Sequence, residues 1–99
     1  MLIPKSFELG GRTYTVTVLP TMGKRGVMGA TYFKSARIEI GKRSKITGTA
    51  YKQEDVDNTF WHELTHAILN DMGSSLDRDE AFVTAFADRL AQSVSTAKL

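Results

Sequence analysis

Residues 61–68 read Trp61-His62-Glu63-Leu64-Thr65-His66-Ala67-Ile68 and contain both histidines of the chain, four positions apart. In an α-helix, side chains at positions i and i+4 lie on the same face, so the imidazoles of His62 and His66 can bind one metal ion. Glu63 projects about 100° further round the helix than His62, where it can hold a water molecule beside the ion. The pattern HExxH therefore predicts a helix that carries a metal site.

The apolar residues around this motif repeat with the period of a helix. We expect this helix to run from about Lys52 to Met72, with Gly73 as the residue that terminates it. Its apolar stripe consists of Val56, Phe60, Leu64, Ala67 and Ile68. The histidines lie beside this stripe, so the metal is expected where the helix meets the rim of the sheet.

A second helix is predicted to follow a short connection at residues 73–75. It is expected to begin near Leu76 or Asp77 and to end near Ser95. Its expected buried face consists of Ala81 or Phe82, Ala85 or Phe86, Leu90 and Val94.

The first half of the chain has the alternation of β-strands. Two strands, Ser6–Leu9 and Arg12–Leu19, flank Gly10-Gly11 and form a predicted hairpin. Two more are predicted at Val27–Phe33 and Ala36–Ile40, and basic loops at 20–26 and 41–48. Strands followed by helices indicate an α+β fold. We expect residues 1–99 to form one zincin-like domain, in which a small twisted sheet of three or four strands, antiparallel or mixed, packs on the HExxH helix and the C-terminal helix.

Length and composition agree with a single folded domain. The chain has 99 residues, 41% of them hydrophobic, and no cysteine. No apolar stretch approaches the roughly 20 residues that span a bilayer, and the N-terminus lacks the pattern of a signal peptide. These features predict a cytoplasmic protein without a membrane partner.

The charges are divided unevenly between the two halves of the chain. Residues 1–52 hold ten Lys and Arg against two acids, whereas residues 53–99 hold three against nine. Such asymmetry can mark nucleic-acid binding, but no basic helix interleaved with aromatic residues accompanies it. Solvated basic loops and acid-coated helices are the preferred explanation, and a nucleic-acid partner is the less favoured one.

Zinc in a hydrolase is usually held by three protein ligands and keeps a fourth position for water. The chain offers no third histidine and no cysteine, so the third ligand must be a carboxylate or be missing. Glu80 is preferred because an antiparallel second helix brings it alongside the histidines, and Asp79 is the second choice. Two other roles stay open, since Asp77 and Glu80 could form a helix capping box and Asp79 could accept a hydrogen bond from a histidine.

Together, Trp61 to Ile68 and the later Asp79-Glu80-Ala81-Phe82 resemble the gluzincin metallopeptidases. The resemblance is strongest over residues 54–92 and is closest to the minigluzincins and to short phage and bacterial zincin-like proteins of the ImmA/IrrE type. It implies one zinc ion with Glu80 as the third ligand. Thr84 departs from the acidic residue that larger gluzincins have at that position, and Tyr32 and Tyr51 are the available substitutes for their oxyanion-stabilising residue.

The resemblance also implies an activity, the hydrolysis of peptide bonds in a peptide or protein substrate. A zinc-bound water would attack the carbonyl group, and Glu63 would take its proton. The substrate is expected to pair with the edge strand at Val27–Phe33. Small proteins of this kind can be latent, with the C-terminal tail (here residues 95–99) in the cleft. The alternative is a metal-stabilised binding or regulatory module without catalysis; oligomeric state is left open.

Overall fold

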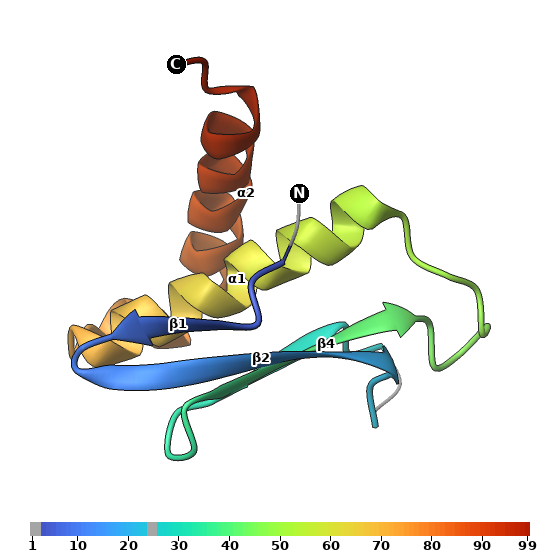
Figure 1. Ribbon diagram of the computed structural model, residues 1–99, viewed down its shortest axis with the longest axis horizontal. Helices are drawn as coiled ribbons and strands as arrows, with labels where there is room; N and C mark the ends of the chain where they lie inside the picture. Colours follow the sequence, from blue (N-terminus) through green and yellow to red (C-terminus); the bar gives the residue numbers. More distant parts are fainter. Residues whose placement is uncertain (1–2, 24–25) are drawn as a thin grey trace.

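The alternating residues of the N-terminal segment form the predicted hairpin (Figure 1). The computed structural model describes residues 3–23 and 26–99, so Lys24 and Arg25 of the predicted basic loop lie outside the described residues. Strand β1 (Ser6–Leu9) pairs antiparallel with β2 (Arg12–Thr21). In β2, Tyr14 and Val16 are buried while the adjacent Thr13, Thr15 and Thr17 are exposed, as the period of two predicts.

The sheet has four strands in the order β1-β2-β4-β3 and is mixed. Strand β4 (Arg37–Arg43) runs parallel to β2, and β3 (Gly29–Tyr32) pairs antiparallel with β4 at the outer edge. Ile38 and Ile40 of β4 are completely buried. The central position of β4 explains this burial, because it has a neighbouring strand on each side.

Two strands continue into segments that were predicted as loops. Strand β2 includes Pro20, and β4 includes residues 41–43. Pro20 is tolerated because β1 pairs only with the first part of β2, which leaves the later part with a free edge on that side. The pairing of Leu19 with Gly41 and of Thr21 with Arg43 holds the two extensions together.

Helix α1 (Gln53–Asp71) carries the HExxH motif across one face of the sheet. Its bounds agree with the prediction, and Gly73 has the positive φ of 69° expected after a helix C-terminus. Val56, Phe60 and Ala67 are buried in a cluster with residues of β2 and β4. The apolar stripe therefore sets which side of α1 faces the sheet.

The start of the second helix differs from the prediction. A 3₁₀ turn, η1 (Ser75–Arg78), follows Ser74, and helix α2 (Glu80–Thr96) begins only at Glu80. The Oδ1 atom of Asp79 accepts a hydrogen bond from the backbone N–H of Phe82 at 3.0 Å and caps the helix. Asp79, rather than Asp77, is thus the N-cap residue, and the capping box of Asp77 and Glu80 that the sequence left open does not form.

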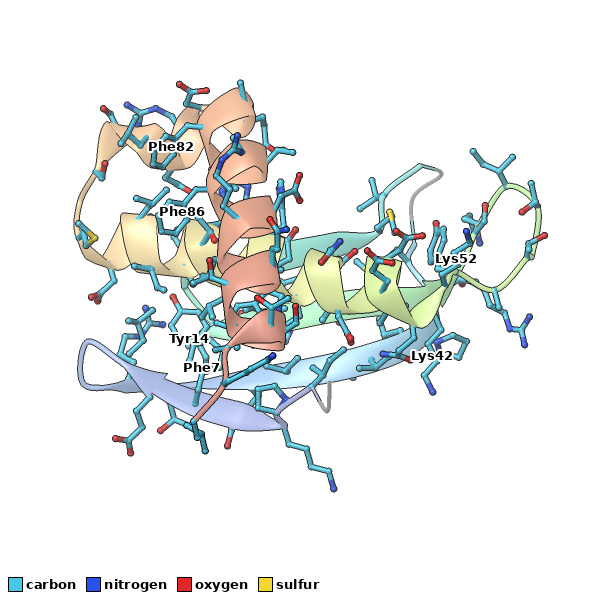
Figure 2. The ribbon with its side chains drawn as sticks, turned by 90° about the horizontal axis from the view of Figure 1, so that it is seen from above. Phe7, Tyr14, Lys42, Lys52, Phe82 and Phe86 are labelled. Carbon is cyan, nitrogen blue, oxygen red and sulfur yellow. The ribbon has the colours of Figure 1, made fainter. Side chains whose placement is uncertain are left out.

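The predicted buried face of α2 is also wrong. The buried residues of α2 are Val83, Ala87 and Ala91, whereas 47% of Phe86 and 50% of Val94 remain exposed. Figure 2 shows Phe82 and Phe86 together on one side of the helix. Helix α2 packs on α1 and η1 but does not touch the sheet extensively, so only the small residues that allow close contact with α1 are covered.

The sheet, α1 and α2 form three successive layers, and α2 rises steeply from α1 (Figure 1). The C-terminal residues lie at the end of α2 opposite Glu80, which for a helix of 17 residues is about 25 Å away. Among the described residues, no helix combines the length and the apolar character needed to cross a membrane.

Candidate metal centre

The side chains of His62, His66 and Glu80 converge between α1 and α2. The Nε2 atom of His62 lies 3.1 Å from Oε2 of Glu80, and the Nε2 atom of His66 lies 2.8 Å from Oε1. The two imidazole rings are 5.0 Å apart between centroids. Both Nε2 atoms therefore face the same carboxylate, which comes from the second helix as the sequence predicts.

The local geometry of the two helices explains this convergence. His62 and His66 are one turn apart on α1. Glu80 is three residues before Val83, so it lies on the same face of α2 as the residues that pack against α1. Because Asp79 caps the helix directly before Glu80, the first turn is held in the orientation that aims the carboxylate at α1.

The three side chains fit a divalent metal ion by donor type and spacing. One ligand atom from each residue lies within 4.8 Å of the other two. Zinc bonds nitrogen and oxygen at about 2.0–2.2 Å in tetrahedral sites, which places adjacent ligand atoms about 3.3 Å apart. The observed separations of 2.8 and 3.1 Å need only a small expansion to reach that value. The group could therefore hold a divalent metal ion.

Asp77 forms a hydrogen bond with the ring nitrogen of His66 that does not face Glu80. Its Oδ1 atom lies 2.8 Å from Nδ1 of His66. Because a carboxylate only accepts hydrogen bonds, Nδ1 carries the hydrogen and Nε2 is directed toward Glu80. Burial of His66 opposes its protonation, but the hydrogen bond to Asp77 and the negative charges of Glu63, Glu80 and Asp77 outweigh burial, so the pKa of His66 is raised above 6.5. The role of a histidine acceptor, expected for Asp79, belongs to Asp77.

Glu63 is buried between α1 and the edge of the sheet, with only 7% of its surface exposed. The hydroxyl of Thr31 on β3 donates to Oε1 of Glu63 at 2.8 Å and also lies 3.1 Å from the backbone oxygen of Glu63. Burial raises the pKa of Glu63 above 4.5, and the glutamate Glu80 adds to that rise. The hydrogen bond from Thr31 and the two histidines oppose it without cancelling it. The environment therefore keeps the pKa of this carboxyl group above that of an exposed glutamate.

Glycine at position 29 allows β3 to approach the helix at Glu63. A Cβ atom on Gly29 would lie 2.6 Å from Cγ2 of Thr59 and 3.2 Å from Cγ of Glu63. Any side chain at this position would push the strand and the helix apart. The contact of Gly29 thus places the edge strand next to the motif, and neither Gly29 nor Thr31 could be identified from the sequence because their partners come from another element.

Glu63 lies between two cavities that open on either side of it. The first, which we call the His62 cavity, has a volume of about 430 Å³ and is lined by Gly29, Asp55, Asp88, His62 and Glu63 among others. The second, the His66 cavity, has a volume of about 260 Å³ and is lined by Thr31, Phe33, Glu63, His66 and Asp77. Glu63 is the residue that lines both cavities.

Other residues considered from the sequence are not brought to the centre. Asp79 is occupied as the helix cap. The ring of Tyr32 lies under the guanidinium of Arg37, 4.3 Å from ring centroid to Cζ. The backbone of Tyr51 bonds to Lys42 at the end of the molecule where α1 begins (Figure 2). Neither tyrosine lines the two cavities beside Glu63.

Comparison of the chain with protein-family models, with curated proteins and with solved structures finds no match in any of the three. The resemblance to the gluzincins therefore depends on the motif residues themselves.

Proposed function

We propose that the protein is a zinc-dependent peptide hydrolase with a small zincin-like fold. His62, His66 and Glu80 are the metal ligands, and Glu63 is the general base. One observation carries the proposal. The Nε2 atoms of both histidines face the Glu80 carboxylate from a separate helix, while the buried Glu63 lies next to them between two cavities.

A zinc ion held by these ligands supplies a Lewis acid that acidifies water and polarises a carbonyl group. Glu63 carries out the proton transfers of the reaction. Thr31 holds Oε1 of Glu63, so Oε2 is the atom left to take a proton. Glu63 accepts this proton from a water molecule as the water oxygen bonds to the peptide carbonyl carbon. It then returns the proton to the amide nitrogen as the C–N bond breaks.

The edge strand β3 offers a place for the substrate backbone. Its inner edge pairs with β4, and no strand of the described residues pairs with its outer edge. An extended peptide can add to such an edge through main-chain hydrogen bonds, with its side chains in alternating pockets. Because Thr31 of β3 bonds to Glu63, a peptide bound to this edge would lie close to the general base. A peptide or protein substrate is therefore favoured over a small hydrolysable molecule.

The test combines metal analysis with a cleavage assay on the parent protein and two variants. We expect the parent to contain one zinc ion per chain and to cleave members of a mixed peptide library, detected by mass spectrometry. Glu63→Gln should keep the zinc and lose turnover by at least about a hundredfold, because it removes the base and leaves the ligands. Glu80→Gln should lose most of the zinc.

Three results would contradict the proposal. Protein that neither retains zinc nor binds it when zinc is added back has no metal centre. Stoichiometric zinc without any cleavage would instead indicate a metal-stabilised binding module. A Glu63→Gln variant as active as the parent would exclude Glu63 as the base. Glu8→Gln serves as the control, since Glu8 is an exposed acid on β1, at the opposite edge of the sheet from β3.

A further inference from the structure

A trough leads away from the His62 cavity along the N-terminal half of α1. A further cavity of about 540 Å³ lies in the corner between this half of α1 and helix α2. Both cavities are lined by Asn58 and Asp88, so they are neighbouring parts of one depression. We call the two together the acidic trough. It begins at His62 and Glu63 and extends beyond Trp61.

The acidic trough carries an excess of negative charge. Four carboxylates other than Glu63 line it, from Glu54, Asp55, Asp57 and Asp88. None of the described residues that line it is Lys or Arg. Within the described part of the chain, the side chains of Glu54, Asp55 and Asp88 have neither a hydrogen bond nor an ion pair. The walls from both helices therefore present carboxylates to whatever fills the trough.

Helix stability explains only part of this arrangement. Glu54 and Asp55 lie in the first turn of α1, where negative charge is favoured by the helix dipole. Asp88 lies in the middle of α2, where the dipole gives a carboxylate no advantage. Its carboxylate lines the same cavities as the acids of α1, so the helix dipole does not account for this part of the negative lining.

Trp61 adds an aromatic wall to the trough. Its ring contacts Phe60 edge to face, 5.5 Å between centroids, which anchors it against the core. Aromatic faces attract ammonium and guanidinium groups, and tryptophan does so most strongly. Carboxylates and an indole along one channel are the groups expected for binding the side chain of lysine or arginine.

Resting on the proposed function, we infer that the acidic trough selects substrates with a lysine or arginine near the bond to be cleaved. This basic side chain lies on the His62 side of Glu63, with its charged end between Asp55 and Asp88 and toward Trp61. The residue on the other side of the bond enters the smaller His66 cavity. Asp55 and Asp88 thus determine specificity without taking part in bond cleavage.

The inference can be tested by binding, separately from turnover. The zinc-loaded Glu63→Gln variant is titrated with matched peptides that carry Lys, Ala or Glu at one position, moved along the sequence. Trp61 is the only tryptophan of the chain, so its fluorescence reports occupation of the trough. We expect the Lys peptide to bind most tightly at a single position. Asp55→Asn and Asp88→Asn should each weaken the binding of the Lys peptide by about two- to fivefold. The affinity for the Ala peptide should stay the same in both variants.

Glu8→Gln, added to the same background, should leave the binding of all three peptides unchanged because Glu8 lies outside the trough. A Glu peptide that binds as tightly as the Lys peptide overturns the inference. So does a preference for Lys that survives both Asp substitutions, or a failure of the Lys peptide to bind at all. Cleavage by the parent without a preference for basic residues would reject the trough and keep the hydrolase. Preferential binding of the Lys peptide without cleavage by the parent would support the trough and reject the hydrolase.

Discussion

His66 is held at both of its ring nitrogens by carboxylates, 2.8 Å from Asp77 on one side and 2.8 Å from Glu80 on the other. When a metal replaces the proton on Nε2, Asp77 still fixes the tautomer and the orientation of the ring. Asp77 therefore positions the ring of His66, and under the proposed function it would act on a bound metal only through that ring. It was among the acids near the motif in the sequence, but no spacing rule distinguished it from Asp79.

Replacing Asp77 should weaken zinc binding. We expect Asp77→Ala to reduce the affinity for zinc by about ten- to a hundredfold, because the ring of His66 loses its hydrogen-bond acceptor. Asp77→Asn should lose less, since its amide oxygen can still accept from Nδ1–H. Competition with a chelating dye measures both affinities. Asp71→Asn is the control, because Asp71 is an exposed acid at the end of α1, the helix that carries His66. Its affinity for zinc should equal that of the parent.

The stability of the metal-free protein should fall as the pH rises from about 6 to 8. His66 has a pKa raised above 6.5, so its protonation stabilises the fold most below that pH and loses this effect as the pH passes the raised value. The raised pKa of Glu63 acts in the same direction, from pH 4.5 upward. Urea unfolding in the presence of a chelator measures the trend, which Asp77→Ala should flatten. If the free energy of unfolding increased with pH over this range, the raised pKa values of His66 and Glu63 would be refuted.

How far the centre could be predicted from the sequence depends on whether its residues share an element. His62, Glu63 and His66 lie on one helix, where spacing alone sets their relative positions. To predict the place of Glu80, it was enough to assume that α2 folds back beside α1. The short connection between the two helices made that the simplest arrangement. Thr31 contributes through tertiary contact alone, so nothing in the local pattern identifies it.

At the scale of elements, periodicity correctly predicted β1, most of β2 and the bounds of α1, because each has one side on the core and one toward solvent. The same reasoning chose the wrong side of α2. That helix contacts α1 through small residues, and its larger side chains lie outside the contact. The hydrophobic residues along one side of a helix do not show whether another element of the fold packs against that side. The parallel pairing of β2 with β4 was likewise beyond a local pattern.

This packing of α2 makes a specific prediction about stability. Val83 is completely buried, whereas 47% of Phe86 is exposed. We expect Val83→Ala to lower the free energy of unfolding by about 2 kcal/mol, through lost burial and the cavity that remains. Phe86→Ala, although it removes more atoms, should cost less than about 1 kcal/mol because about half of the side chain already meets water. Chemical denaturation of both variants tests the order, and a larger loss for Phe86→Ala would show that its side of α2 is covered.

At the scale of the whole molecule, the candidate metal centre lies at the junction of two layers, helices α1 and α2. Two ligands come from α1, which is packed on the sheet, and the third from α2, which lies beyond it. A metal that binds all three at once stabilises the folded chain relative to the unfolded one. Four acids of the helical half, Glu54, Asp55, Asp57 and Asp88, lie along this same junction in the acidic trough.

Zinc should therefore raise the melting temperature. At a free zinc concentration a hundred times the dissociation constant, the added stability is about 2.7 kcal/mol. For a chain of this size that corresponds to roughly 10–20 °C. Thermal scans with and without a chelator measure the shift, and Glu80→Gln should abolish most of it. An equal shift in Glu80→Gln would mean that the two histidines bind the ion without α2.

The residue that caps α2 and the residue that completes the metal centre are immediate neighbours in the chain. A helix turns about 100° for each residue. Inserting one amino acid between Asp79 and Glu80 would swing the carboxylate away from the histidines, although the helix itself would still form. Apart from Asp77 and Asp79, the linker between the two helices can change in composition more easily than the spacing at its final junction.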